Sequence, residues 1–132
     1  GVQGIGYNTV DAVNDKADFT LSMQEFRRQL DALGGAHKYL TYTVGAGQDK
    51  LRQLDLVGLN AVTDWTNLMA YDYHGGWEGT GPTDFNANLY ADPASPNVKK
   101  GGDMAKYDTD DAISYIVANG VPANKVTMGL PF

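Results

Sequence analysis

Apolar segments of two kinds alternate along this chain, and their order limits the folds open to it. The first kind repeats an apolar residue every three or four positions, as one face of an α-helix does, at residues 19–33, 51–62 and 109–119. The second kind is short and rich in β-branched and aromatic residues, as strands are, at residues 39–44, 65–70 and 125–130. Strands that alternate with helices predict an α/β fold with parallel strands and helical crossovers.

Glycines and capping residues indicate where the first helix ends and begins. Gly34-Gly35 ends it. Its start is open, because Asp18 and Thr20 are both N-cap candidates and Ser22 with Glu25 has the spacing of a capping box. The start is therefore expected within one turn of Asp18.

Charge narrows the class of partner. The chain has 10 Lys plus Arg against 16 Asp plus Glu, a formal net charge of -6. This balance argues against nucleic acid and against an anionic membrane surface as partners, and a neutral substrate fits better. The 132 residues are the length of one ordinary domain, and the absence of cysteine excludes disulfides and thiolate metal sites.

The chain has no segment that predicts membrane insertion or secretion. No apolar run approaches the ~20 residues that span a bilayer. The beginning, Gly1-Val2-Gln3-Gly4, has neither an initiator Met nor a signal-peptide pattern. We therefore expect the chain to be a piece of a longer protein.

The stretch from Trp65 to Gly75 indicates where function lies. It is an apolar strand that ends in Tyr71, Asp72 and a glycine turn. Parallel β/α architectures present their chemistry at such strand ends, where the rigid backbone passes into a loop. The following residues, about 75–107, are dense in Gly, Pro, Asn and Asp, and a loop of this length in a compact domain is usually functional.

The same residues carry a family resemblance. Leu68-Met69-Ala70-Tyr71-Asp72-Tyr73-His74-Gly75 resembles the Met-x-Tyr-Asp motif of bacterial-type chitinases of glycoside hydrolase family 18. The flanking segments resemble this family in the same order along the chain, namely residues 18–31, 39–47 and 120–132. Residues 86–90 also resemble the family's Asn-x-Pro-Leu-Tyr segment, without its proline.

The resemblance implies a partial TIM (β/α)₈ barrel. A whole barrel needs ~250 residues, so residues 1–132 would form a single, incomplete catalytic barrel domain of about three βα units. They would run from the helix after the fourth barrel strand through the seventh strand, with 75–107 as a substrate-side loop. The family's general-acid signature, Asp-x-x-Asp-x-Asp-x-Glu, does not occur in the sequence, and its two glutamates, Glu25 and Glu78, do not match it.

The resemblance also implies a reaction and roles for four residues. Family 18 chitinases hydrolyse β-1,4-linked N-acetylglucosamine polymers with retention, and the substrate's own acetamido oxygen is the nucleophile. By resemblance, Tyr71 would position the acetamido group and Asp72 would contact sugar hydroxyls or the acetamido region. Met69 would form the pocket floor and Trp77 would stack on a sugar ring. No cofactor is implied, and the isolated chain is expected to be inactive because the acid is missing.

Plainer interpretations of these residues exist. Tyr71 and Asp72 are also what a core aromatic and a turn-forming acid look like, and Trp77 could simply anchor its loop by burial. Asp72 and His74 have a spacing that could suggest a metal site, but the only other histidine, His37, is distant in sequence. The sequence therefore predicts no metal.

Two other hypotheses remain open. The chain could come from a catalytically silent, lectin-like chitin-binding relative whose acid is replaced. It could also be a small α/β ligand-binding domain with doubly wound order. In the main hypothesis the partners are chitin or N-acetylglucosamine oligosaccharides, the parent is secreted by family resemblance, and open sheet edges favour self-association of the isolated chain.

Overall fold

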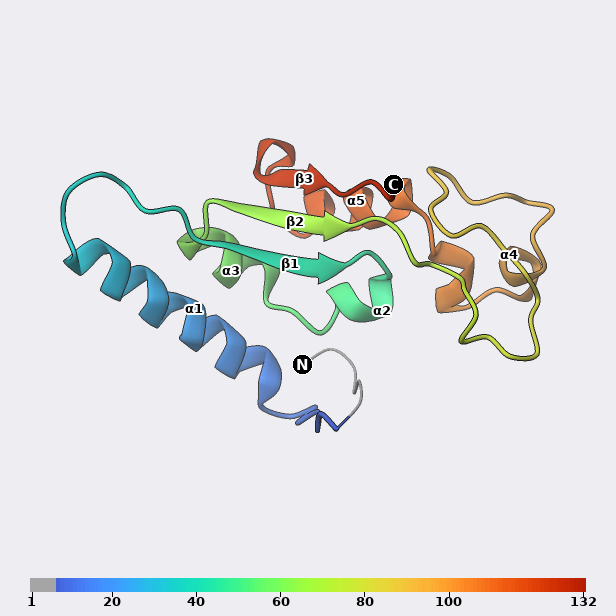
Figure 1. Ribbon diagram of the computed structural model, residues 1–132, viewed down its shortest axis with the longest axis horizontal. Helices are drawn as coiled ribbons and strands as arrows, with labels where there is room; N and C mark the ends of the chain where they lie inside the picture. Colours follow the sequence, from blue (N-terminus) through green and yellow to red (C-terminus); the bar gives the residue numbers. More distant parts are fainter. Residues whose placement is uncertain (1–6) are drawn as a thin grey trace.

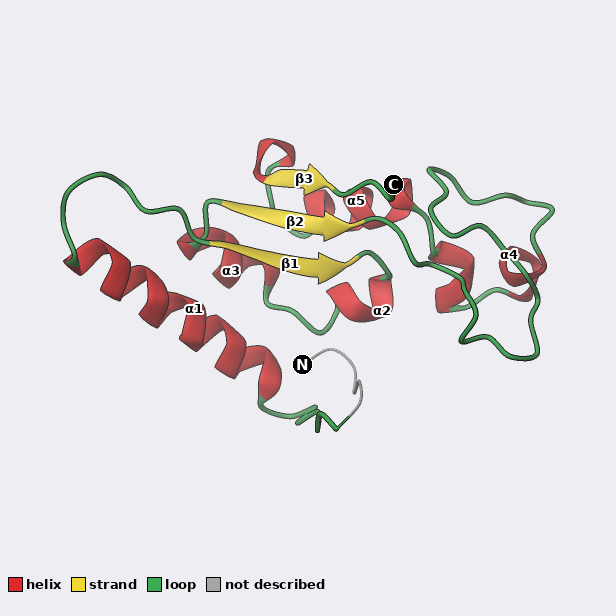
Figure 2. Cartoon of the chain, viewed as in Figure 1, coloured by secondary structure: helices red, strands yellow, loops and turns green. Residues whose placement is uncertain are grey.

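The computed structural model describes residues 7–132 as one sheet with helices (Figures 1 and 2). The strands are β1 (Thr41–Gly45), β2 (Trp65–Met69) and β3 (Val126–Met128). The helices are α1 (Asp15–Ala32), α2 (Gln48–Leu51), α3 (Leu56–Val62), α4 (Pro96–Lys100) and α5 (Thr109–Ala118), with short 3₁₀ turns η1 (Asp103–Lys106) and η2 (Ala123–Lys125). Within these described residues no helix is both long and apolar enough to cross a membrane.

The three strands are parallel, in the order β1-β2-β3. Thr43 lies beside Asn67, and Asn67 lies beside Thr127. All three strands point toward the end of the molecule that carries the long loop (Figure 1). The expected α/β class with parallel strands and helical crossovers is thus confirmed.

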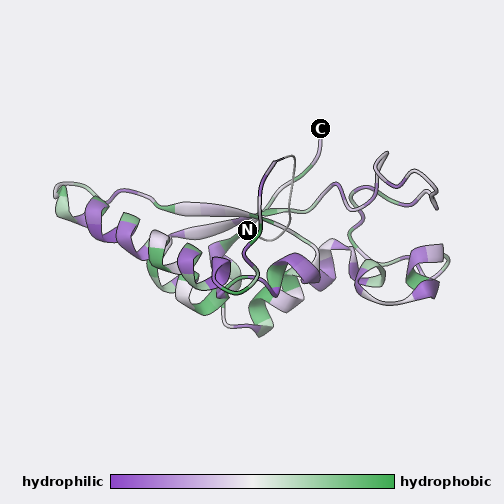
Figure 3. Cartoon of the chain, turned by 90° about the horizontal axis from the view of Figure 1, so that it is seen from below, coloured by the Kyte–Doolittle hydropathy of each residue, from purple (hydrophilic) through white to green (hydrophobic). Residues whose placement is uncertain are grey.

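The core lies between one face of the sheet and the helices. Tyr42 and Val44 of β1 and Thr66 and Leu68 of β2 alternate with more exposed neighbours and are buried. The helices gather on one side of the sheet when it is seen edge-on (Figure 3). The helices and their flanks contribute large, fully buried apolar side chains on that side: Leu51, Leu59, Ile116 and Val121.

The first helix begins within one turn of Asp18, but none of the capping candidates in the sequence is its N-cap. It starts at Asp15 with Asn14 as N-cap, so Ser22 and Glu25 lie inside the helix and form no capping box. The Asp11 carboxylate accepts hydrogen bonds from the Asn14 backbone and side chain, and thereby organises the turn before the helix. Ser22 instead donates to the backbone carbonyl four residues earlier.

Residues 51–62 form parts of two short helices rather than one. Asp55 separates them, because its side chain accepts a hydrogen bond from Gly58 N at 3.0 Å and caps α3. Gly58 has a reason to be glycine here: an added Cβ would lie 2.1 Å from Asp55 Oδ2. Glycine weakens the interior of a continuous helix. At position 58 it leaves room for the side chain of Asp55, which caps the start of α3.

The stretch 75–107 is mostly irregular, but it contains α4 and η1. Ser95 caps α4 by accepting from Asn97 N and Val98 N, and Pro96 follows the cap. The loop is tethered near its base, because Tyr73 N donates to the Asn86 carbonyl and Thr109 N donates to the Asn88 carbonyl. Its middle therefore returns to the end of β2 and to the start of α5.

Candidate functional site

A groove of about 580 Å³ opens at the carboxyl ends of β1 and β2. Parallel strands end at one edge of the sheet, so the residues that follow them gather there. Met69, Tyr71, Asp72 and Trp77 all line this groove. The remaining lining residues come from the turn after β1, from the strand end and from the segment before α5: Gly45, Ala46, Gly47, Lys50, Tyr73 and Tyr107.

The backbone turns sharply at Asp72. Its φ of 55° lies in the left-handed region, which a residue other than glycine seldom adopts. Tyr71, just before it, is half-buried and Asp72 is exposed. Gly129 after β3 leaves room for the Tyr71 ring, since an added Cβ there would lie 3.0 Å from Tyr71 Cε1 and 2.9 Å from the Leu68 carbonyl oxygen.

Asn86 holds this turn in place. Its side-chain amide donates to Asp72 Oδ1 at 3.1 Å and to the His74 carbonyl oxygen at 3.0 Å, and its own carbonyl accepts from Tyr73 N at 2.9 Å. A conformation that costs about 1–3 kcal/mol persists only when its surroundings support it, and Asn86 supplies that support. Within the segment 86–90, which resembles a segment of the family, Asn86 thus contacts Asp72 and supports its turn.

Lys50 and Tyr107 form a polar cluster in the groove that sequence reasoning missed. Lys50 Nζ donates to the Tyr107 hydroxyl at 3.1 Å and pairs with Asp49, and the Tyr107 hydroxyl donates to Asp49 Oδ2 at 3.2 Å. Burial alone would lower the pKa of Lys50, but Asp49 and Tyr107 outweigh it and the pKa is raised. Burial raises the pKa of Tyr107. Both side chains therefore keep their protons. The single hydroxyl proton of Tyr107 is donated to Asp49, whereas Lys50 has three N–H groups for its two partners and keeps one for a ligand.

Trp77 is both packed and available. Its ring lies over Gly75, where an added Cβ would come within 2.5 Å of the indole atoms Cη2 and Cζ3. The side chain is nevertheless 64% exposed. One part of the indole thus contacts the turn while much of its surface remains open to a ligand.

The remaining residues singled out in the sequence, Met69 and His74, have different surroundings. Met69 is half-buried and lines both this groove and a second one beside α1. His74 does not face Asp72 as a metal ligand would, because it is buried and its Nδ1 lies 3.1 Å from both Glu78 oxygens. Residues 7–132 contain no cluster of three or more His, Cys, Asp or Glu that could hold a metal ion.

Comparison with known proteins identifies the family. The model for "Glycosyl hydrolases family 18" matches residues 5–132. The chain belongs to this family. It is 38% identical over 119 residues to Chitinase 1 of Aphanocladium album, and the match covers 86% of the chain and 26% of that protein. It is 32% identical over 121 residues to Chitinase A1 of Niallia circulans, of which it covers 17%.

Solved structures agree with this assignment and with the barrel fold. Chitinase ChiA74 from Bacillus thuringiensis superposes with a TM-score of 0.87 at 35% identity, covering 100% of this chain and 20% of that one. Human YKL-39, described as a pseudo-chitinase with retained chitooligosaccharide binding, superposes with a TM-score of 0.79 at 25% identity, covering 89% of this chain and 32% of that one. The family 18 chain is thus an arc of a TIM barrel, and it spans 26% of the length of Chitinase 1 and 17% of the length of Chitinase A1.

Proposed function

We propose that this chain forms one wall of the substrate groove in an enzyme that hydrolyses chitin. The observation that carries the proposal is the gathering of Met69, Tyr71, Asp72 and Trp77 on one groove at the strand ends of a family 18 segment. A neutral polysaccharide has many hydroxyls and flat C–H faces, and the groove offers hydrogen-bonding groups beside an exposed aromatic ring.

In this proposal the substrate's acetamido carbonyl attacks the anomeric carbon and configuration is retained. The Tyr71 hydroxyl donates to the acetamido group and holds it in its attacking position, because a phenol is a directional donor with few torsions to freeze. Asp72 contacts sugar hydroxyls, Met69 forms the floor, and Trp77 stacks on a ring. No cofactor takes part.

The proton donor must come from a residue other than the two glutamates of this sequence. Hydrogen bonds from Arg28 and Gln29 lower the pKa of Glu25 to about 2, and this residue lies on α1. Glu78 accepts a hydrogen bond from Gly75 N at 3.1 Å and pairs with His74. A general acid contributes ~100- to 10,000-fold, so the isolated chain should bind but not turn over its substrate.

A ligand pair tests the binding part of the proposal. Calorimetric titration of the chain with an N-acetylglucosamine tetramer should show binding, whereas cellotetraose, which lacks the acetamido groups, should bind at least several-fold more weakly. Equal affinity for both would contradict the acetamido role of the groove. Hydrolysis of the tetramer by the purified chain at the rate of a whole enzyme would contradict the inference that the chain lacks the general acid.

A lectin-like parent is the second candidate, and the similarity to YKL-39 favours it. That relative is described as a pseudo-chitinase that still binds chitooligosaccharides. Binding by this chain supports both candidates equally. The residue at the last position of the family's acid signature in the complete gene decides between them: glutamate indicates an enzyme, and a residue without an acidic proton indicates a lectin.

Two further properties follow from the proposal. Chitin is an insoluble polymer, so we expect a secreted parent. Among residues 7–132, β1 and β3 are the outer strands of the sheet, and unpaired strand edges promote association between chains. The isolated chain should therefore elute from gel filtration above the size of a monomer, and a sharp monomer peak would contradict this.

A further inference from the structure

The turn that carries Trp77 is held from behind by a buried polar cluster. His74 is 4% exposed, and its Nδ1 lies 3.1 Å from both oxygens of Glu78. Glu78 also accepts from Gly75 N at 3.1 Å, and Glu78 N donates to the Gly75 carbonyl oxygen at 3.0 Å. Residues 75–78 thus form a turn closed by its own last side chain, with Trp77 at its tip.

The other side of His74 faces the centre of the long loop. His74 Nε2 lies 3.9 Å from Asp84 Oδ2, which is longer than a direct hydrogen bond. A cavity of about 10 Å³ adjoins both residues, the room of one water molecule, and Asn88, whose Oδ1 is buried and unpaired, also lines it. A water there would bridge the imidazole to the Asp84 carboxylate.

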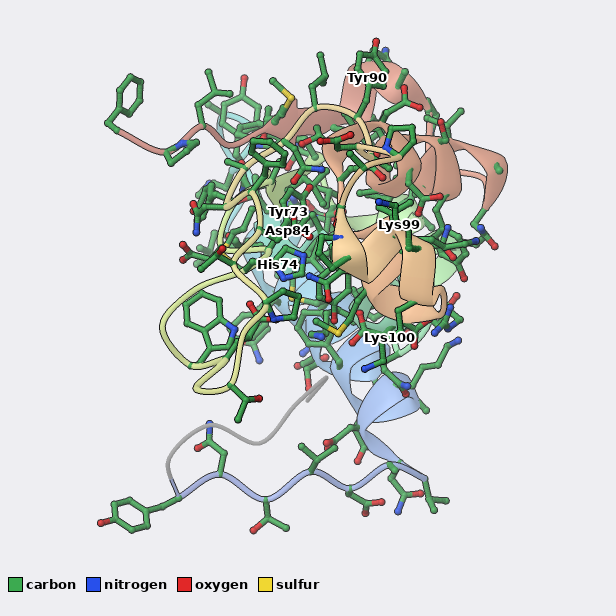
Figure 4. The ribbon with its side chains drawn as sticks, turned by 90° about the vertical axis from the view of Figure 1, so that its right-hand side faces the viewer. Tyr73, His74, Asp84, Tyr90, Lys99 and Lys100 are labelled. Atoms are coloured by element: carbon green, nitrogen blue, oxygen red, sulfur yellow. The ribbon has the colours of Figure 1, made fainter. Side chains whose placement is uncertain are left out.

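Asp84 ties together distant parts of the loop. It accepts hydrogen bonds from Asn97 Nδ2 at 2.9 Å, from Phe85 N at 2.9 Å and from the Ser95 hydroxyl. Burial works against its ionised form, but these hydrogen bonds outweigh burial and the pKa of Asp84 is lowered. The carboxylate is therefore a fixed negative charge facing His74. Figure 4 shows Tyr73, His74 and Asp84 grouped in the middle of the view, with Lys99 and Lys100 on α4 and Tyr90 farther out.

We propose that His74 and Glu78 are positioning residues, which set the angle at which Trp77 meets a sugar ring in the groove. Neither needs to touch the ligand: His74 is buried, and Glu78 points into its own turn. Trp77 is 64% exposed, so few packing contacts fix the orientation of its indole ring. The turn beneath the ring therefore decides where its face points. This inference rests on the proposed function, since it assumes that the groove binds sugar.

A double-mutant cycle on the 132-residue chain tests this role. The measured quantity is the dissociation constant for the N-acetylglucosamine tetramer, obtained by calorimetry. Trp77→Ala should weaken binding roughly tenfold and Glu78→Ala roughly fivefold. In the double variant the Glu78→Ala substitution should add almost nothing, because a positioning residue has no effect once the residue it positions is gone.

Matched controls separate positioning from general damage. Glu78→Gln keeps an acceptor oxygen for Gly75 N and His74 and should restore affinity to within about twofold. Glu25→Ala removes the other glutamate of the chain, on the exposed surface of α1, and should leave affinity unchanged. Urea unfolding of each variant reports any loss of stability separately.

The outcomes distinguish this inference from the proposed function. If the unsubstituted chain does not bind the tetramer, the proposed function fails. If the chain binds and Trp77→Ala weakens binding, but Glu78→Ala has no effect or acts independently of Trp77, then only the positioning role is overturned. A fivefold loss that disappears in the Trp77→Ala background supports it.

Discussion

The two ends of the sheet use charged groups in opposite ways. At the amino ends of the strands, the Asp64 carboxylate accepts from Leu40 N at 2.7 Å, lies 2.6 Å from His37 Nε2 and faces the Arg27 guanidinium at 3.8 Å. At the carboxyl ends, Asp72 is exposed beside a groove and Lys50 faces into it.

We infer from this difference that the amino ends of the strands serve stability and that the groove at the carboxyl ends serves binding. The cluster around Asp64 holds residues 33–40 against the start of β2. The charged groups of this cluster therefore pair with other groups of the protein itself. In the groove, by contrast, Asp72 and Trp77 are exposed, and Lys50 keeps one N–H beyond its bonds to Asp49 and Tyr107. Substitutions at the first end should therefore change the free energy of unfolding, and substitutions at the second end should change affinity or rate.

The largest effect is expected from Tyr71→Phe. We would measure it in a graft, in which residues 7–132 replace the matching segment of Chitinase A1 of Niallia circulans. Loss of one donor to the group that carries the reaction should lower kcat by roughly 100- to 1,000-fold with little change in stability. Tyr39→Phe, an exposed tyrosine at the opposite end of the sheet, is the matched control and should leave kcat unchanged. Equal kcat values for the two variants would remove the functional distinction between the two ends.

The second effect is a loss of stability at the opposite end. Asp64→Ala in the same graft should lower the free energy of unfolding by about 2 kcal/mol, because the Leu40 amide and the Arg27 guanidinium lose a charged partner. Asp31→Ala removes an exposed partner of Arg27 and should cost no more than about 0.5 kcal/mol. Neither variant should alter affinity for the tetramer, and a change in affinity would break the comparison.

The contribution of Asp64 should also depend on pH. Burial works against ionisation of this carboxyl, but the bonds from Leu40 and His37 and the charge of Arg27 outweigh it and lower its pKa. The ionised form is thus favoured in the folded state, so the stabilisation is complete above the unfolded pKa of about 3.9 and is lost as the pH falls through the lower folded value. The stability difference between Asp64→Ala and the parent should shrink over that range.

The smallest effect is expected in the groove, from a substitution beneath the Trp77 ring. A methyl group at Gly75 would meet the Trp77 ring at 2.5 Å, whereas one at Gly76 would meet nothing within 4 Å. Gly75→Ala should displace the indole and weaken tetramer binding roughly fivefold, a change of about 1 kcal/mol. Gly76→Ala should bind like the parent. If calorimetry gives the two variants the same affinity, the placement of Trp77 over Gly75 does not matter for binding.

The fold was largely predictable from sequence because its signals are local. The periodic spacing from Phe19 to Leu33 and the β-branched run after Tyr39 each depend on neighbours in sequence, and so does the strand that ends at Tyr71. The errors were also local. The sequence pattern gives Asp55 no visible role as a cap, although its bond to Gly58 N is what divides residues 51–62 into two helices.

The candidate site was predictable only where one strand end carries it. Tyr71 and Asp72 follow β2 directly, so the edge of the sheet places them together. Lys50 and Tyr107 are 57 positions apart, and only the path of the long loop brings the hydroxyl to the ammonium. The position of Lys50 just after β1 was a usable signal, but nothing before Asp108 marked Tyr107 as a groove residue.

The tethering of the long loop has a consequence for how such proteins diversify. Because the Asn86 and Asn88 carbonyls accept from Tyr73 N and Thr109 N, the excursion is closed at its base by backbone bonds. A change of length between Asn88 and Thr109 should therefore leave β2 and α5 in place. It would still alter what these elements carry, because Tyr107 lines the groove and Ser95 and Asn97 hold Asp84.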